Sequence, residues 1–362
     1  MNAKPVRGGT GRRAWIRAAL AVALGSSVGW ASTGSASTAV TQSAAARYDL
    51  RVGAAAGDVL HIQGTSKLSL SAVAAHFVRD GARSAVPGFA LDQLETANLI
   101  VRDRIEALKQ ESADAGRSTV FTRHFERART AGSVEQFGNV STFERVSRLE
   151  GRTVRFDMGA AEPAGQRVAV VDGSEEGGPL DPQLLDGLAA QLDFHRALPP
   201  EPVEVGARWT VPAETVHAFF QPFGHLRTLA ESGGGPWQAL QREAFAAPTG
   251  KLTAELVRVD GDAGDRRAVV RITGRVLAAA RDGAAESPDA ARLAHAVGLR
   301  IEVDATLSIH LEQKVWVELR SELRIALSQE QNEAREDGAV ASRELEFEGD
   351  FELALSQRLE RR

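Results

Sequence analysis

The sequence predicts an α+β fold in which a long, curved antiparallel sheet, half-barrel-like in shape, packs on two or more amphipathic helices. Apolar and polar residues alternate over 299–328 and over shorter stretches elsewhere, as they do in strands with one buried face. Two other segments, 90–111 and 182–197, carry apolar residues at helical spacing. The content of 43% hydrophobic and 25% charged residues is typical of a globular protein.

The N-terminus has the features of an export signal. Basic residues without an acid precede an apolar run at 18–24, and small residues then offer cleavage after Ala31 or Ala36. Arg12 and Arg13 are compatible with export by the twin-arginine route as an alternative to the general secretory route. We expect a periplasmic or extracellular protein. Its parts would be a signal peptide at 1–36, a flexible mature N-terminus at 37–46, and one elongated β-rich domain at 47–362, in which two halves could meet near 198–204.

The cysteine content excludes disulfide bonds, and the net charge argues against nucleic acid as a partner. The chain has no cysteine, so an exported fold must rest on its apolar core without disulfides. Removal of 1–36 would take away five of the 43 basic residues and none of the 48 acidic ones, which leaves 38 − 48 = −10. A chain of this charge repels phosphate backbones, and we therefore expect no nucleic acid partner.

The elements follow from the patterns in order. Strands are expected at 48–52 and 60–70, and apolar residues from Phe89 to Leu108 predict the first helix, with Gly116 beyond its end. Asp181 suits a helix N-cap and Pro182 the first helical position of the second helix. Further strands are expected near 118–126, 134–147, 151–158 and 345–355, together with a hairpin that turns at 260–265.

The alternation over 299–328 is too long for one strand. Thirty residues at about 3.3 Å each would extend roughly 100 Å, so the chain must reverse. A two-residue turn would move the apolar face from odd to even positions, whereas an odd-length loop, or a turn with one bulged residue, keeps it. The apolar series lapses at Gln313. We place the turn at 312–314 in an odd-length loop, with the odd positions from Leu299 to Leu327 facing inward.

The even positions of this segment carry opposite charges, such as Arg300 and Glu302, that can pair across strands on a solvent face. A transmembrane barrel would also alternate. The chain has one tyrosine, no aromatic girdle and two expected helices, which favours a sheet that packs on helices. We expect no transmembrane segment in the mature chain.

No catalytic or metal-binding motif stands out. The chain lacks the G-x-S-x-G elbow, the H-E-x-x-H pair, the dinucleotide glycine pattern and a calcium loop, so we expect no catalytic residue, metal site or cofactor. The irregular aromatic segment 216–225 could form a mobile flap over an apolar cavity, or a loop whose rings pack into the core. The candidate ligand-binding residues are Trp209, His217, Phe219, Phe220, Phe223 and His225.

The octet Val-Gly-Ala-Arg-Trp-Thr-Val-Pro at 205–212 resembles a V-G-x-x-W-x-V-P segment of uncharacterised secreted bacterial β-sheet proteins. The plan of helices, hairpins and long C-terminal strands is similar to the LolA/LppX-type half-barrel lipoprotein carriers, whose curved sheet wraps helices around an apolar cavity. This resemblance concerns architecture only and assigns no functional residue. The long apolar face and the aromatic segment 216–225 favour a lipid or another apolar small molecule as the ligand. The chain lacks the cysteine through which some of those carriers are lipid-anchored.

Three functions follow from these patterns. The first is a non-enzymatic exported protein that binds a hydrophobic ligand between sheet and helices. The second is a structural or interaction module of the cell envelope that uses the charged sheet face or an exposed edge. The third is a hydrolase built from dispersed residues, for which His217 or His225 would have to meet an acid and a nucleophile. The patterns identify no protein partner.

Overall fold

The structure is a computed structural model. It describes residues 46–79, 82–108, 118–157, 167–172, 185, 188, 194–220, 222–223, 247–281, 295–334 and 340–361. The chain from Ala45 to Arg362 forms one compact unit, and everything below concerns this unit.

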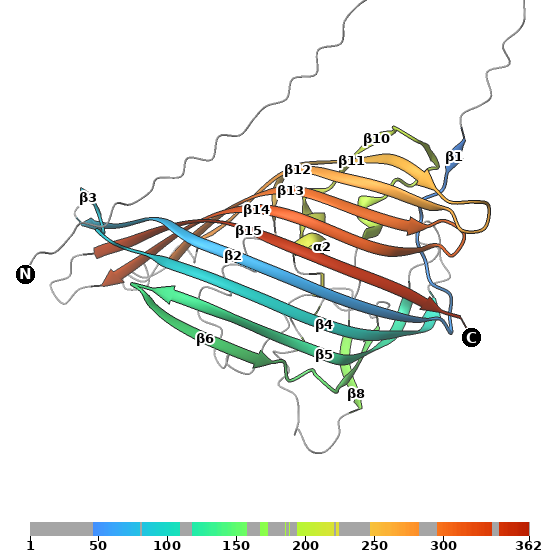
Figure 1. Cartoon of the computed structure of the whole chain (residues 1–362), viewed down its shortest axis with the longest axis horizontal. Helices are drawn as coiled ribbons and strands as arrows, with labels where there is room; N and C mark the ends of the chain where they lie inside the picture. Colours follow the sequence, from blue (N-terminus) through green and yellow to red (C-terminus); the bar gives the residue numbers. More distant parts are fainter. Residues whose placement is uncertain are drawn as a thin grey trace, which may run out of the picture. The chain divides into compact units, whose positions relative to one another are not determined.

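Thirteen strands form one antiparallel sheet, and two short strands, β1 and β9, pair separately. The main path runs β10-β11-β12-β13-β14-β15-β2-β4-β5-β7-β8, with β3 paired to β2 and β6 paired to β5 (Figure 1). The last strand thus lies between β14 and the early strand β2. The bounds are β1 Arg47–Tyr48, β2 Val59–Arg79, β3 Ala82–Ala85, β4 Leu91–Leu108, β5 Ser118–Gln136, β6 Asn139–Val146, β7 Thr153–Asp157, β8 Arg167–Asp172, β9 Val203–Glu204, β10 Arg208–Val211, β11 Thr249–Asp260, β12 Arg267–Arg281, β13 His295–His310, β14 Val315–Ala334 and β15 Val340–Glu360.

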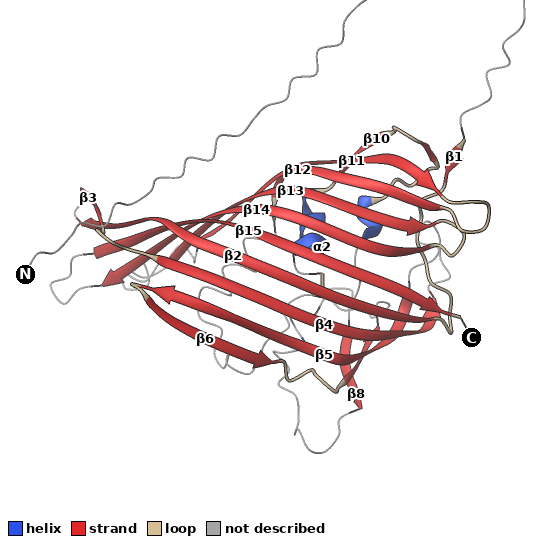
Figure 2. Ribbon diagram, viewed as in Figure 1, coloured by secondary structure: helices blue, strands red, loops and turns tan. Residues whose placement is uncertain are grey.

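The expected α+β fold with amphipathic helices is wrong. The segment 90–111, expected as a helix, is largely the 18-residue strand β4, and the helical segments described against the sheet are short (Figure 2). They are the 3-10 helices η3 Phe194–Ala197 and η4 Ala213–Thr215, and the five-residue α-helix α2 Val216–Phe220. The second expected helix, 182–197, lies largely outside the described residues. The described fold is a large antiparallel sheet with short helical segments on one face.

The first helix was mistaken because β4 carries polar groups on its buried face. Asp103 lies on the same face as Val101 and Ile105, and its buried carboxylate is paired with an arginine. Leu94, which was taken as part of a helical core stripe, is instead 41% exposed on the opposite face. A buried charge interrupts the period of two, and the remaining apolar residues then match a period of 3.6.

The long alternation does form two paired strands, β13 and β14, and the turn lies close to where it was placed. The loop is Leu311 to Lys314, four residues rather than an odd number. Apolar parity survives because Ser308 pairs with Glu318 while Ile309 pairs with Trp316, which leaves Val317 as a bulged residue. The odd positions from Leu299 to Leu311 are buried, as expected.

The sheet has one apolar face, which we call the inner face because α2 packs on it. On the four central strands its buried residues repeat every second position. They include Val303 and Leu307 of β13, Leu319 and Leu323 of β14, Phe351 and Leu355 of β15, and Val270 and Ile272 of β12. The other face, called the outer face, carries cross-strand ion pairs such as Arg275–Glu302 at 2.6 Å.

A line of glycines crosses the inner face. A Cβ atom at Gly349 would overlap the Ser69 carbonyl oxygen, and one at Gly274 would overlap that of Lys251. The strand backbones come too close there for any side chain, as happens where a sheet bends sharply. Gly274 and Gly132 belong to one row of paired residues, which runs Gly274, Val303, Leu323, Phe351, Leu68, Glu95 and Gly132.

We use this row to divide the sheet. The proximal half lies toward the β13–β14 turn. The distal half includes the row itself and lies toward the end of β2 near Phe77 and the β5–β6 turn at Phe137. Gly349 belongs to the distal half, in the next row beside Leu70.

Candidate ligand-binding face

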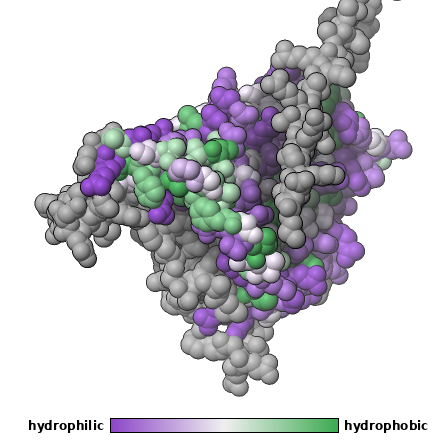
Figure 3. Space-filling model, turned by 60° about the vertical axis from the view of Figure 1, so that its left-hand side comes forward, coloured by the Kyte–Doolittle hydropathy of each residue, from purple (hydrophilic) through white to green (hydrophobic). Residues whose placement is uncertain are grey.

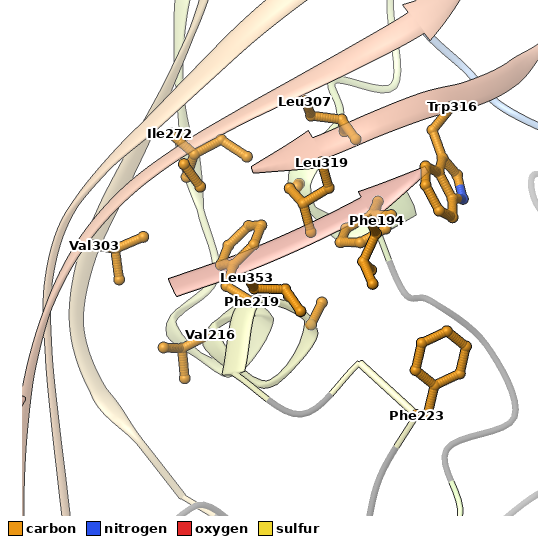
Figure 4. Close-up of a cluster of buried hydrophobic side chains, with 14 of the residues drawn as sticks. Phe194, Val216, Phe219, Phe223, Ile272, Val303, Leu307, Trp316, Leu319 and Leu353 are labelled. Carbon is orange, nitrogen blue, oxygen red and sulfur yellow. The ribbon is translucent and has the colours of Figure 1, made fainter. Parts of the chain in front are cut away.

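The inner face of the proximal half is filled by side chains. Phe219 of α2 and Phe194 of η3 are fully buried, with ring centroids 6.2 Å apart. Phe194 meets Trp316 of β14 edge-to-face at 5.5 Å. Figure 4 shows these rings among the aliphatic side chains of the central strands. Ser321 of β14 fastens the helix by donating its hydroxyl to the Phe219 carbonyl oxygen at 3.1 Å.

The candidate residues of the aromatic segment belong largely to this core. Trp209 is half-buried, and its indole Nε1 donates to the Ala197 carbonyl oxygen at 2.8 Å. The ring centroids of Phe220 and Phe351 lie 4.8 Å apart. Phe223 is 4% exposed and His217 is half-buried. Their packing favours the second interpretation of the segment, in which its rings enter the core, although residues 216–220 form the helix α2 rather than a loop. His225 lies outside the described residues.

The structure adds a buried ion pair that the sequence patterns did not single out. Arg123 of β5 donates to both carboxylate oxygens of Asp103 of β4, at 2.8 and 2.7 Å. The guanidinium carbon lies 5.4, 5.3 and 5.1 Å from the ring centroids of Phe121, Phe156 and Phe223. Rings at this range stabilise a cation. Asp103 and Arg123 are visible in the sequence as opposite charges, but their pairing can be predicted only once the register of β4 and β5 is known.

In the distal half the inner face is partly exposed mainly on β2, whereas residues of β12, β13 and β14 there, such as Val276, Ile301 and Ile325, are buried. On β2 the side chains Leu68, Leu70 and Ala72 are half-buried, and so is Leu345 of β15. Phe77, farther along the same face of β2, is 42% exposed. We call these five residues the candidate face. Its neighbours on β4 are polar, because Glu95 pairs with Leu68 and Gln93 pairs with Leu70.

The outer face of the distal half contains a hollow of about 590 Å³. Its floor is made of small residues that sit side by side in neighbouring strands, namely Ala279, Gly298 and Ser328. Leu277 and Val73 stand at its margins, 50% and 55% exposed. An adjoining hollow of about 500 Å³ shares the same floor and is bordered by Glu330, Glu344 and Glu346.

Ion pairs fasten the N-terminal segment across the proximal end of the sheet. Asp49 accepts hydrogen bonds from Arg51 at 2.8 Å and from Lys314 of the β13–β14 turn at 3.0 Å. The Arg51 guanidinium, together with Lys314, holds the pKa of the Asp49 carboxyl well below its usual range against the opposing effect of burial. The Gly53 backbone N–H donates to the Lys314 carbonyl oxygen, which completes the attachment.

Metal and membrane-helix features are absent from the described part of the chain. No group of three or more His, Cys, Asp or Glu residues among these residues is placed to hold a metal ion. No helix described there combines the length and the hydropathy needed to cross a membrane.

Comparison with known proteins adds no assignment. No protein-family model matches the chain, and no curated protein matches it. Among solved structures it has 7% identity with the "InvG secretin domain beta-barrel from Salmonella SPI-1 injectisome NC-base". That match covers 84% of this chain and 62% of the other, with a TM-score of 0.13, which carries no argument about fold or function.

Proposed function

We propose that this chain is a non-enzymatic exported protein that holds an apolar small molecule, such as a lipid, against the inner face of the distal half. The observation that carries the proposal is the incomplete burial of the candidate face. Leu68, Leu70, Ala72 and Leu345 remain partly exposed on the same face where proximal residues such as Leu319 are fully buried. Apolar surface left accessible beside an otherwise packed core favours an apolar ligand.

The shape of the candidate face favours an elongated ligand. Leu68, Leu70 and Ala72 follow one another at every second position of β2. Beyond a bulge at Val73, the same face continues with the buried Ala75 and then with Phe77, over whose ring the Arg343 guanidinium lies. At about 3.3 Å per residue, the strip from Leu68 to Phe77 is roughly 30 Å long. An extended hydrocarbon chain matches this shape better than a compact ring system does.

The neighbouring polar residues favour a ligand with a polar end. Gln93 and Glu95 of β4 face the same side as Leu70 and Leu68, and the Gln93 amide lies 3.5 Å from the Glu95 carboxylate. An amphipathic molecule could place its chain along β2 and its hydrogen-bonding group over these side chains. A lipid with hydroxyl or amine donors would suit an acidic partner such as Glu95.

The test uses Leu70→Glu and a matched control, Ser71→Glu. Leu70 points to the inner face and Ser71 to the outer face of the same strand. Both variants add one carboxylate, but only the first adds it to the candidate face, where a charge opposes an apolar ligand. Binding of a fluorescent fatty acid, and its displacement by an unlabelled one, measures the affinity. We expect Leu70→Glu to lower this affinity about tenfold or more, and Ser71→Glu to bind like the wild type.

Mass spectrometry of organic extracts from the purified protein supplies an independent readout. We expect a copurified lipid with the wild type and with Ser71→Glu, and little with Leu70→Glu. Absence of both a copurified lipid and fatty-acid binding in the wild type would refute the proposed function. Equal binding by the two variants would show that the ligand binds elsewhere than at the candidate face.

A further inference from the structure

The distal end of the sheet carries an exposed aromatic hairpin tip. Phe137 forms the β5–β6 turn with Gly138 and is 59% exposed, and Val140 at the start of β6 is 62% exposed. Phe89, just before β4, meets Phe137 edge-to-face with ring centroids 5.8 Å apart. We call Phe89, Phe137 and Val140 the aromatic tip.

The backbone at Phe137 makes this exposure more informative. Gln136 pairs with Asn139, so the turn has two residues, and both have positive φ, 51° at Phe137 and 80° at Gly138. Two-residue turns of this kind favour Asn, Asp or Gly at the first position, because a Cβ atom is strained there. A large ring that faces water in a strained conformation contributes little to folding, and its presence points to a role outside the fold.

The distal half also carries exposed apolar side chains outside the tip, on β2, β4 and β12. Among the described residues, eight large apolar side chains are the most exposed, and six of them lie in the distal half. Figure 3, in which this end comes forward, shows hydrophobic residues gathered there beside hydrophilic ones. The six are Val73, Phe77, Leu94, Phe137, Val140 and Leu277.

We propose that the aromatic tip contacts a lipid bilayer surface, with Phe137 and Val140 inserted among the lipid chains at the interface. Large apolar side chains on a projecting turn can enter the boundary between headgroups and acyl chains without a preformed pocket. A stable protein–protein interface needs about 800 Å² from each partner, whereas a Phe side chain supplies roughly 150–250 Å². Three partly exposed side chains fall short of the protein requirement, which favours the bilayer.

The charges near the tip indicate the kind of lipid surface. Asp92 of β4 pairs with Glu135 of β5, which pairs with Val140, so two exposed acids share a row with the tip. The nearby Arg145 stacks on Phe143 at 4.3 Å, and Arg83 is engaged by Glu344 and Glu346 at 2.7 and 3.0 Å. Acids beside the insertion site repel anionic headgroups, so the contact suits a zwitterionic surface.

This inference goes beyond the proposed function and can fail independently of it. The candidate face lies on the inner side of β2 and β15, whereas the tip lies at the β5–β6 turn. A protein that binds a fatty acid without touching vesicles would keep the proposed function and lose the membrane contact. The reverse result would keep only the contact.

The experiment compares the purified wild type with Phe137→Asn by flotation with phosphatidylcholine vesicles, and with vesicles that also contain phosphatidylglycerol. Asparagine suits the positive φ, so the variant is expected to fold and to have a thermal midpoint equal to or above that of the wild type. We expect Phe137→Asn to lower the vesicle partition coefficient about tenfold or more. Val205→Asn, at an exposed apolar site outside the distal half, is the matched control and should bind normally.

Each outcome decides the matter. Binding to phosphatidylcholine that is lost in Phe137→Asn and kept in Val205→Asn supports the membrane contact, as does weaker binding when phosphatidylglycerol is added. No flotation of the wild type, or equal flotation of both variants, would overturn it. Flotation that requires phosphatidylglycerol and disappears with salt would overturn it as well, because basic residues elsewhere would then carry the contact. Self-association lost in Phe137→Asn without vesicle binding would replace the bilayer by a second copy of the chain.

Discussion

The two halves of the sheet are built from the same alternating strands but differ in how far their apolar side chains are buried. In the proximal half, helical segments, aromatic rings and a buried ion pair fill the inner face, and Leu307 and Leu319 are wholly excluded from solvent. In the distal half, Leu68 and Leu70 remain partly exposed, and large apolar side chains reach the surface. The difference shows that strand pattern alone does not determine whether an apolar face becomes core or an accessible surface.

The largest expected effect lies in the buried ion pair of the proximal half. Arg123→Met removes the guanidinium and leaves the Asp103 carboxylate buried without its bidentate partner. We expect a loss of about 3–5 kcal/mol in the free energy of unfolding, measured by urea denaturation at pH 7. The double variant Asp103→Leu/Arg123→Met should recover much of this loss. A single variant as stable as the wild type would show that the pair is dispensable.

The next prediction compares the same truncation in both halves. Leu319→Ala empties a fully packed site and should cost about 3 kcal/mol, because the cavity adds to the lost burial. Leu70→Ala removes a half-exposed side chain and should cost about 1 kcal/mol. Chemical denaturation of the two variants measures both values. Equal losses would mean that the distal half is as tightly packed as the proximal half.

The glycine line offers a third comparison, between two distal glycines. Gly349→Ala would push a Cβ atom into the Ser69 backbone, and we expect a cost of about 2 kcal/mol. At Gly298 the nearest atom is the Ser328 hydroxyl oxygen, which can rotate away, so Gly298→Ala should cost less than about 1 kcal/mol. Thermal unfolding separates the two. If both substitutions are neutral, the strands at Gly349 can move apart without loss of stability.

The smallest effect concerns the attachment of the N-terminal segment. The pKa of Asp49 is lowered by Arg51 and Lys314, so its carboxylate stabilises the fold above its unfolded pKa of about 4. That contribution falls as the pH drops toward the lower folded pKa. Because the pair is partly exposed, Asp49→Asn should cost only about 0.5 kcal/mol at pH 7. The difference from the wild type in urea unfolding should shrink below pH 4, and a difference that grows there would contradict the assignment.

The candidate site shows where sequence patterns stop being sufficient. The aromatic segment 216–225 was singled out from the sequence, and in the structure Phe219 and Phe223 are buried in the core. The candidate face on β2 was not identified, because Leu68 and Leu70 have the same pattern as buried strand residues. Exposure depends on what packs against a side chain, and that partner is distant in the sequence. Phe137 was likewise overlooked, since its positive φ becomes visible only in the turn.

The sequence by itself determined the local and periodic features. Alternation specified the long strands β13 and β14, the reversal near Gln313 and the inward odd positions, because a one-residue shift would turn the whole apolar face to water. Tertiary structure decided the rest. It made β4 a strand by pairing it with β2 and β5, which brings Asp103 against Arg123. It also placed Val317 in a bulge, and left the inner face of β2 partly exposed in the distal half. These outcomes depend on contacts between residues far apart in the chain, which local periodicity does not encode.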